Sequence, residues 1–170
     1  MTMNLTVSAY ALLEIAESPL LDAHGEPLEP HTVKLMPSPR FPERAPEIES
    51  GRIYRHQIAF DFNAGTYLMH CLFIEQLAEL ADYAPTVIGR SQMSHANGAI
   101  VAKEGPFKEL IDFSIVSGTL GTFVCAKLAE DFERFMRIVD ADAAPMLAET
   151  YRNWYFALTL ASNRGAVQLS

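Results

Sequence analysis

The sequence lacks the motifs that mark the best-known hydrolases and metal sites. It has no GxSxG, HExxH or CxxC, the signatures of a nucleophile elbow, a zinc protease and a zinc ribbon. No two of its five histidines stand three or four residues apart, the spacing that places both on one metal from a single helix turn. We therefore expect no metal site and no cofactor. The absent signatures argue against an enzyme without excluding one.

Long apolar runs and a basic N-terminal start are also absent. No stretch reaches the roughly 20 apolar residues that a membrane helix needs. Charged residues interrupt the most hydrophobic stretches: Glu75, Glu79, Lys127 and Arg152. Residues 1 to 18 hold no Lys or Arg before their apolar part, whereas a secretory signal begins with basic residues. These absences predict a cytoplasmic protein without a membrane span.

Cysteine is scarce, and basic residues are outnumbered. The two cysteines, Cys71 and Cys125, lie in segments with an apolar helical pattern, which favours reduced, buried thiols over a redox role. Thirteen Lys and Arg against 21 Asp and Glu give a net charge of −8. Such an acidic chain repels a phosphate backbone, so we expect no direct nucleic-acid binding.

The N-terminal third combines a periodic stretch with a proline-rich one. Apolar residues recur at intervals of three and four between Leu5 and Ala16, which favours a short helix, although Thr6 and Val7 also suit a strand. Residues 18 to 51 contain seven prolines, and each proline fixes φ and removes a backbone donor. We expect this irregular segment to be either pinned across the surface or used for contact.

The rest of the chain alternates between strand and helix patterns. Residues 54 to 62 alternate apolar and polar side chains, and residues 98 to 103 suit a second, short strand. Four segments favour helices: 67 to 81, 106 to 113, 122 to 139 and 145 to 163. With no break between domains, the sequence predicts an α+β fold. It would be one mainly helical domain over residues 1 to 170, with a small antiparallel sheet and the Pro-rich segment at 18 to 51.

Residues 117 to 122, SGTLGT, stand just before a predicted helix. A glycine loop at that place can present backbone N–H groups to an anion at the positive end of the helix dipole. The phosphate loop of nucleotide hydrolases needs a lysine after its last glycine, and Gly121 is followed by threonine; the dinucleotide fingerprint needs a third glycine. We therefore favour an ordinary helix cap, with anion binding as the alternative.

A polar pocket is the main ligand-binding hypothesis. Thr66 and Tyr67 begin one predicted helix, and Ser117 and Thr119 precede another. If the two helix starts converge, they form a polar pocket floored by aromatic rings. With an arginine such as Arg55 nearby, this pocket would take a small anionic ligand.

Catalysis by groups that meet only in the folded chain is an alternative. Asp61 and Asp112 lie near glycine-bearing turns, and His56 lies on the aromatic side of the predicted strand, as a boundary residue often does. An acid/base site would require these three within hydrogen-bond reach of one substrate.

A protein partner is the other binding hypothesis. Residues 31 to 60 carry five basic against three acidic side chains, and Arg40 and Arg44 among them are candidates for contact with a partner. Trp154 belongs to an aromatic helix that either faces a partner or is buried nearly all round, which is the commoner case. The same helix and the Pro-rich segment also fit a subunit interface in a homo-oligomer.

Four stretches resemble a family of small bacterial and phage proteins to which no activity is attached. They are AGTYLMHCLFIEQLA (64 to 78), GPFKELIDFSIVSGTLG (105 to 121), AKLAEDF (126 to 132) and YRNWYFALTLASNRGAV (151 to 167). The family has Gly-Ser-Tyr where this chain has Gly65-Thr66-Tyr67, and an acidic pair where it has Ile115 and Ser117. The resemblance implies a small binding or inhibitory protein and supplies no catalytic residues.

These observations favour a non-catalytic cytosolic binding protein. It would act as a phage-related inhibitor or sequestering protein on a protein partner or a small anionic ligand. An enzyme assembled only in three dimensions and a structural, oligomeric module are the alternatives.

Overall fold

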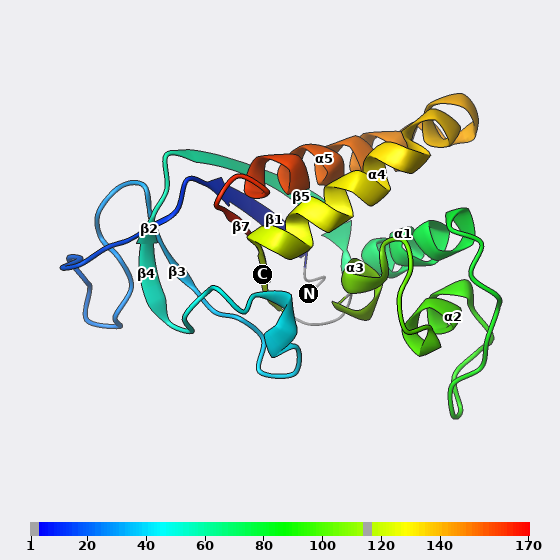
Figure 1. Ribbon diagram of the computed structural model, residues 1–170, viewed down its shortest axis with the longest axis horizontal. Coiled ribbons are helices and arrows are strands. Elements are labelled where there is room, and N and C mark those ends of the chain that lie inside the picture. The colour runs from blue at the N-terminus through cyan, green and yellow to red at the C-terminus, as the bar shows by residue number, and fades with distance from the viewer. Residues whose placement is uncertain (1–3, 114–116) are drawn as a thin grey trace.

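A four-stranded sheet joins the two ends of the chain. In the computed structural model, which describes residues 4–113 and 117–170, all its neighbouring strands are antiparallel. Their order across the sheet is β5 (Ile58–Thr66), β1 (Asn4–Ala11), β7 (Ala166–Leu169) and β6 (Gly118–Gly121). One face of this sheet carries the long helices (Figure 1).

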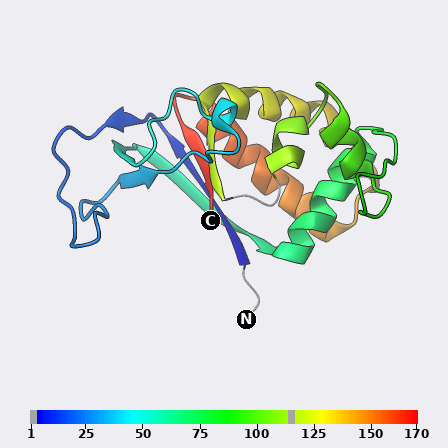
Figure 2. The ribbon, with the colours of Figure 1, turned by 90° about the horizontal axis from the view of Figure 1, so that it is seen from below.

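The remaining elements flank that sheet. A second sheet has the order β2 (Glu14–Ile15), β4 (Arg52–Arg55) and β3 (Thr32–Leu35). The helices are α1 (Tyr67–Leu80), α2 (His95–Val101), α3 (Lys108–Phe113), α4 (Thr122–Asp142) and α5 (Pro145–Ala161). Figures 1 and 2 show the small sheet at one end of the molecule and α1 to α3 at the other. The predicted α+β fold, mainly helical with antiparallel sheets, is confirmed. None of the described helices combines the length and the apolar character needed to cross a bilayer.

The opening helix predicted for residues 5 to 16 is wrong, because this segment forms β1. Val7, Ala9 and Ala11 are buried at alternate positions, the period of a strand with one face on the core. In so short a stretch the apolar residues also fit a helical spacing. Pairing with β5 on one side and β7 on the other decides the conformation.

The strand predicted for residues 54 to 62 is divided between two sheets. Its first part belongs to β4 and its second to β5, with His56 and Gln57 between them. Phe60 and Phe62 pack on the main core as their alternation predicts, whereas Tyr54 packs on Leu35 in a smaller cluster. The pattern identified strand residues correctly, but it carries no information on which sheet each part joins.

Two predictions near α3 need correction. Residues 98 to 103 do not form a strand, since most of them lie in α2, which Ser94 caps by accepting a hydrogen bond from Asn97 N–H. The helix predicted from Pro106 begins at Lys108 instead. Phe107 has a φ of 59°, and its N–H donates to the buried Asp131 carboxylate at 3.0 Å. This tertiary contact displaces the helix start.

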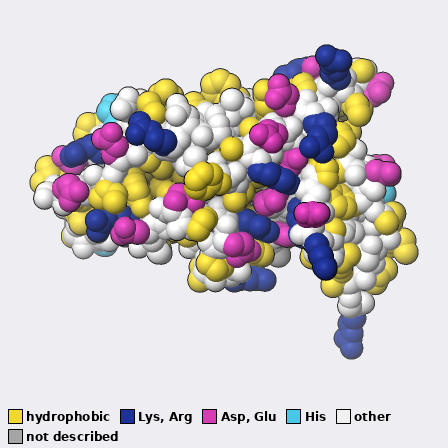
Figure 3. Space-filling view, viewed as in Figure 1, with side chains coloured by type: hydrophobic (Ala, Val, Ile, Leu, Met, Phe, Trp, Pro, Cys, Tyr) yellow, Lys and Arg dark blue, Asp and Glu magenta, His cyan; other side chains and the backbone are white. Residues whose placement is uncertain are grey.

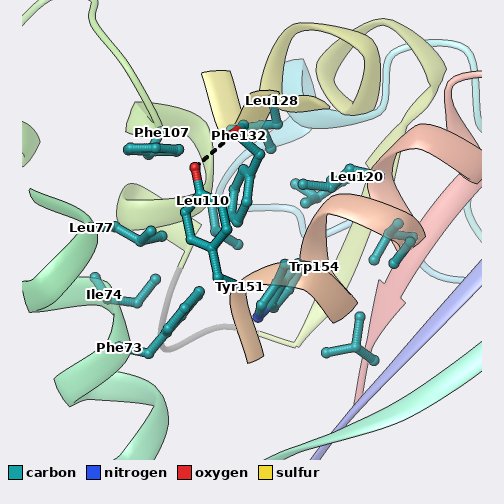
Figure 4. Packing of buried hydrophobic residues seen from close by; sticks show 14 of the residues in the cluster. Phe73, Ile74, Leu77, Phe107, Leu110, Leu120, Leu128, Phe132, Tyr151 and Trp154 are labelled. Atoms are coloured by element: carbon teal, nitrogen blue, oxygen red, sulfur yellow. Dashed lines mark hydrogen bonds between the residues drawn. The ribbon is translucent and has the colours of Figure 1, made fainter. Parts of the chain in front are cut away.

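The helical predictions for α4 and α5 are confirmed, and these two helices supply much of the core. Leu128 and Phe132 on α4 are fully buried, as are Tyr151 and Trp154 on α5. Tyr151 donates its hydroxyl hydrogen to the carbonyl oxygen of Phe132 at 2.6 Å, which joins the two helices (Figure 4). Burial raises the pKa of Tyr151, so this hydroxyl stays protonated and keeps donating.

The Pro-rich segment contains β3 near its middle and is pinned to the domain over its second half, which includes a short 3-10 turn, Pro42–Arg44. Arg44 forms an ion pair with Asp112 of α3 at 2.9 Å. Phe41 packs on Phe113 with ring centroids 5.8 Å apart. Of the two roles expected for this segment, the pinned one applies here.

Candidate functional site: a groove between α1 and the α4–α5 hairpin

The glycine stretch SGTLGT is a strand that runs directly into a helix. Gly118 to Gly121 form β6, and α4 begins at Thr122. No side chain of the stretch caps the helix; instead the carboxylate of Glu47, from the Pro-rich segment, accepts a hydrogen bond from Thr122 N–H. The prediction that residues of the stretch itself cap this helix is therefore wrong. The anion at the positive end of α4 is one of the chain's own carboxylates.

Replacing Glu47 with alanine is expected to lower the free energy of unfolding by about 0.5 to 1 kcal/mol, the usual range for a charge at a helix N-terminus. Urea unfolding followed by circular dichroism measures this loss. The matched control is Glu43→Ala, an exposed carboxylate in the same segment, 3.9 Å from Arg44. Equal losses in the two variants would contradict the capping role of Glu47.

The two helix starts of the predicted ligand pocket lie at opposite ends of the sheet. Thr66, at the end of β5, pairs with Asn4 of β1. Three residues further along β1, Val7 pairs with Leu169 of β7, and Leu169 pairs with Gly118 at the start of β6. The start of α1 thus lies level with the beginning of β6, whereas α4 starts beyond the other end of β6. The pocket of Thr66, Tyr67, Ser117, Thr119 and Arg55 is not formed.

Each residue of that predicted pocket has another environment. The Thr66 hydroxyl caps α1 by accepting from Met69 N–H at 3.3 Å. Thr119 is fully buried, while Tyr67 and Ser117 are exposed. Arg55 lies in the small sheet and pairs with Glu29 at 3.3 Å.

The predicted acid/base residues are divided between two regions. His56 packs on Tyr10 and His31, with ring centroids 4.8 and 5.8 Å away, and burial lowers its pKa. Asp112 lies on α3, held by Arg44 at 2.9 Å and Lys108 at 3.0 Å. Asp61 lies on the exposed edge strand β5. No contact among the described residues joins Asp112 to the other two, so we do not propose a site built on this trio.

Of the predicted partner residues, Arg40 alone is exposed. Trp154 is fully buried between the sheet and α1, where its ring stacks on Phe73 at 6.5 Å, so it cannot contact a partner. Arg44 has a side chain only 13% exposed, because it is used to pin the Pro-rich segment. The commoner alternative for the aromatic helix, burial, is the one observed.

No metal site is found in the described part of the chain, and one of the two thiols is buried. No group of three or more His, Cys, Asp and Glu side chains there converges as metal ligands would. Cys125 is buried and burial raises the pKa of its thiol, while Cys71 is half-buried. Cys125 is therefore an unreactive core residue.

An apolar groove lies between α1 and the end of the α4–α5 hairpin. It consists of two adjoining hollows of about 460 and 260 Å³, which share Gln76, Ala144 and Leu147. Figure 3 shows the surface indented between the tip of that hairpin and α1, at the right of the molecule. We call this feature the α1–α5 groove.

One wall of the α1–α5 groove is a stripe along α1. Its residues follow the three- and four-residue spacing of one helical face: Met69, Leu72, Phe73, Gln76, Leu77 and Leu80. Met69 and Leu72 are 44% and 57% exposed, whereas Phe73 and Leu77 of the same stripe are buried. The stripe spans about 17 Å, or three helical turns.

The other wall comes from the end of α4 and the start of α5. Ile138 and Met146 are 49% and 68% exposed there, and Leu147 lies between the two hollows. Methionines such as Met69 and Met146 adapt their shape to a ligand, because their side chains are unbranched and polarizable. Glu79 and Asp142 are the charged residues of the lining, which has no Lys or Arg.

The sequence analysis missed this groove because helical spacing alone does not separate the buried face of α1 from an exposed apolar one. The buried residues are His70, Phe73, Ile74, Leu77 and Ala78. The signal was present, since Leu68, Met69 and Leu72 are apolar residues outside that set. A helix apolar on more than one face is typical of one that contacts two neighbours.

No protein-family model, curated protein or solved structure matches this chain. The resemblance to small bacterial and phage proteins thus stays a prediction. Function has to be argued from the surface itself.

Proposed function

We propose that this protein is a non-catalytic binding protein that holds an amphipathic helix of a protein partner in the α1–α5 groove. The observation that carries the proposal is a three-turn stripe on α1 that exposes Met69 and Leu72 and faces a second wall that exposes Ile138 and Met146. Helix-in-groove recognition uses such a surface, with ligand side chains at i, i+3, i+4 and i+7. The anionic-ligand version of the binding hypothesis loses its basis, because its pocket is not formed.

Charge selects among amphipathic helices. The groove lining carries Glu79 and Asp142 and no basic residue, and the chain as a whole has a net charge of −8. Complementary potentials speed association and exclude wrong partners. The partner helix therefore carries Lys or Arg beside its apolar face.

We place this interaction in the cytoplasm, and inhibition of the partner is its proposed consequence. An acidic surface with no reactive group of its own acts by occupying a partner's contact surface. The family resemblance to small bacterial and phage proteins agrees with such an inhibitory role.

The test uses labelled synthetic peptides and fluorescence anisotropy. The probe is a helical peptide with leucines at i, i+3, i+4 and i+7 and lysines elsewhere, compared with the same peptide carrying glutamates. We expect the lysine peptide to bind and the Leu72→Lys variant to weaken it about tenfold or more, as for a central apolar contact. Leu28→Lys is the matched control, because Leu28 is 64% exposed outside the groove.

Two outcomes would refute the proposal. One is equal affinity for the lysine and glutamate peptides, which would remove the role of Glu79 and Asp142. The other is an equal effect of Leu72→Lys and Leu28→Lys, which would show that the peptide binds elsewhere on the acidic surface.

A further inference from the structure

The two edges of the four-stranded sheet differ in what covers them. Along β6, the Pro-rich segment lies against the strand, with Ser38 beside Gly118 and Glu47 beside Gly121. Along the opposite edge, β5 pairs with β1 on its inner side and with no described strand on its outer side. This edge is independent of the α1–α5 groove and of the function proposed for it.

The open edge of β5 has little of the usual protection. Edge strands are normally kept from pairing by proline, lysine, a β-bulge, a short length or a covering loop. β5, IAFDFNAGT, has neither proline nor lysine and carries Asp61 as its one charge, and its bulge lies near its end, after Asn63. Residues 58–63 are therefore a regular stretch able to accept another strand.

The outward hydrogen-bonding groups of β5 belong to alternate residues. Thr6 and Ser170 exchange both backbone hydrogen bonds, so every second residue of β1 from Thr6 bonds to the β7 side and the residues between them bond to β5. Val7, Ala9 and Ala11 therefore bond to Phe62, Phe60 and Ile58. Ala59, Asp61 and Asn63 direct their N–H and C=O groups outward, and a strand added at this edge would hydrogen-bond with those three residues.

We infer that this protein forms a two-fold dimer in which β5 pairs antiparallel with β5 of a second copy, centred on Phe62. In this register Asp61 of each copy forms a backbone hydrogen-bonded pair with Asn63 of the other. The four-stranded sheet becomes one continuous sheet across the dimer. A symmetric contact of this kind requires a surface that complements itself.

Charge favours this register over its neighbours. Asp61 stands opposite Asn63 of the second copy, twice by symmetry. The Asn63 side-chain oxygen already accepts from Gly65 N–H at 2.7 Å, which leaves the amide hydrogens to donate to the Asp61 carboxylate. Centring the pair on Asp61 would instead place two carboxylates directly opposite, which is destabilising. Centring it on Phe60 would place Asp61 opposite Ala59, whose side chain offers the carboxylate no donor.

Exposed apolar residues at the two ends of β5 complement each other in the same register. Ile58, 48% exposed, begins the strand, and Tyr67 and Leu68, 56% and 67% exposed, directly follow it. The two-fold axis brings the beginning of one strand beside the end of the other, so each copy covers these residues of its partner. Beside the edge, Phe156 is 53% exposed and packs on Phe60 at 4.7 Å. This self-complementarity favours a second copy over an unrelated strand.

The first measurement is the mass of the purified full chain by size-exclusion chromatography with light scattering. We expect twice the chain mass of 18.9 kDa for the unmodified protein and a single chain mass for Ile58→Lys. Ile100→Lys is the matched control, because Ile100 is 44% exposed on α2, away from β5, and this variant is expected to stay dimeric. Circular dichroism checks that the variants are folded.

Cysteine cross-linking tests the register in a Cys71→Ser background. Mixing Asp61→Cys protein with Asn63→Cys protein should give a disulfide-linked dimer under mild oxidation, because opposed residues of this kind have Cα atoms close enough for a disulfide. Asp61→Cys protein alone should cross-link far less. A monomeric unmodified protein, a dimer that survives Ile58→Lys, or preferred Asp61→Cys self-linking would each overturn the inference. None of these outcomes bears on peptide binding in the α1–α5 groove.

Discussion

Replacing Asp112 with alanine is expected to lower the free energy of unfolding by about 3 to 5 kcal/mol, the usual loss when one partner of a buried ion pair is removed. Asp112 accepts from Arg44 at 2.9 Å and pairs with Lys108 at 3.0 Å. All three side chains are at most 13% exposed, so solvent cannot take the place of the carboxylate. The variant would leave two cations buried without their counterion.

The loss also reaches the Pro-rich segment, because Arg44 is its link to α3. Lys108 keeps its hydrogen bonds to the carbonyl oxygens of Ala99 and Ile100 at the end of α2. Among the described residues, the other ion-pair partner of Arg44 is Glu43, which lies 3.9 Å away and is exposed. We therefore expect faster proteolysis of residues 36 to 51 in the Asp112→Ala variant, in addition to the lower stability.

The matched control is Asp140→Ala. Asp140 also pairs with an arginine, Arg152, at 2.6 Å, but the two side chains are 47% and 57% exposed. Exposed pairs of this kind contribute about 1 kcal/mol or less. Urea unfolding of both variants at neutral pH measures the difference. If the two variants lose equal stability, the α3 ion pairs do not hold the segment as described.

Replacing His70 with phenylalanine is expected to raise stability at pH 7 by about 1 kcal/mol and to make it less sensitive to acid. His70 is buried in α1 beside the rings of Phe73 and Trp154, 6.5 and 6.1 Å away. Neither ring nitrogen has a hydrogen-bond partner in the described chain. Phenylalanine keeps the stacked ring and removes the unpaired polar atoms.

The pH dependence follows from the lowered pKa of His70. Burial lowers this pKa to about 4, whereas an unfolded histidine has a pKa of about 6.5. Between these values the unfolded chain binds a proton that the folded chain does not, so stability falls as the pH falls from 6.5 towards 4. The full loss from this residue is roughly 3 kcal/mol, and it is absent above pH 7.

The measurement is the difference in unfolding free energy between the unmodified protein and His70→Phe at several pH values from 7 to 4. That difference should grow as the pH falls. His24→Phe is the control, because His24 is exposed and its replacement should leave the pH profile unchanged. A difference that stays constant with pH would mean that folding does not lower the pKa of His70.

The long helices were predictable because local spacing determined them. In α5 the apolar residues recur at intervals of three and four residues: Tyr151, Trp154, Leu158 and Ala161. An apolar stripe with this spacing is buried when the segment forms a helix with that face on the core. β1 was not predictable in the same way. The apolar residues between Leu5 and Ala16 also fit a helical spacing, and only pairing with β5 and β7 selects the strand.

The candidate site was less predictable than the fold. The α1–α5 groove joins Leu72 with Met146, which are far apart in the sequence, and no spacing rule relates them. The predicted polar pocket failed for a similar reason, since the ends of β5 and β6 at which α1 and α4 begin depend on strand order. Strand order is a property of the folded chain and leaves no periodic trace in either segment.

The sequence by itself determined the α+β class, the positions of the long helices and the absence of the familiar catalytic motifs, because each depends on residues within about five helical turns of one another. The tertiary structure alone decided how surfaces are used. It buried Trp154, turned Glu47 onto the start of α4, left β5 with an open edge and left Met69 and Leu72 of the stripe on α1 exposed. Each of these depends on which distant segments pack together, and packing is decided by the free energy of the whole core rather than by any local pattern.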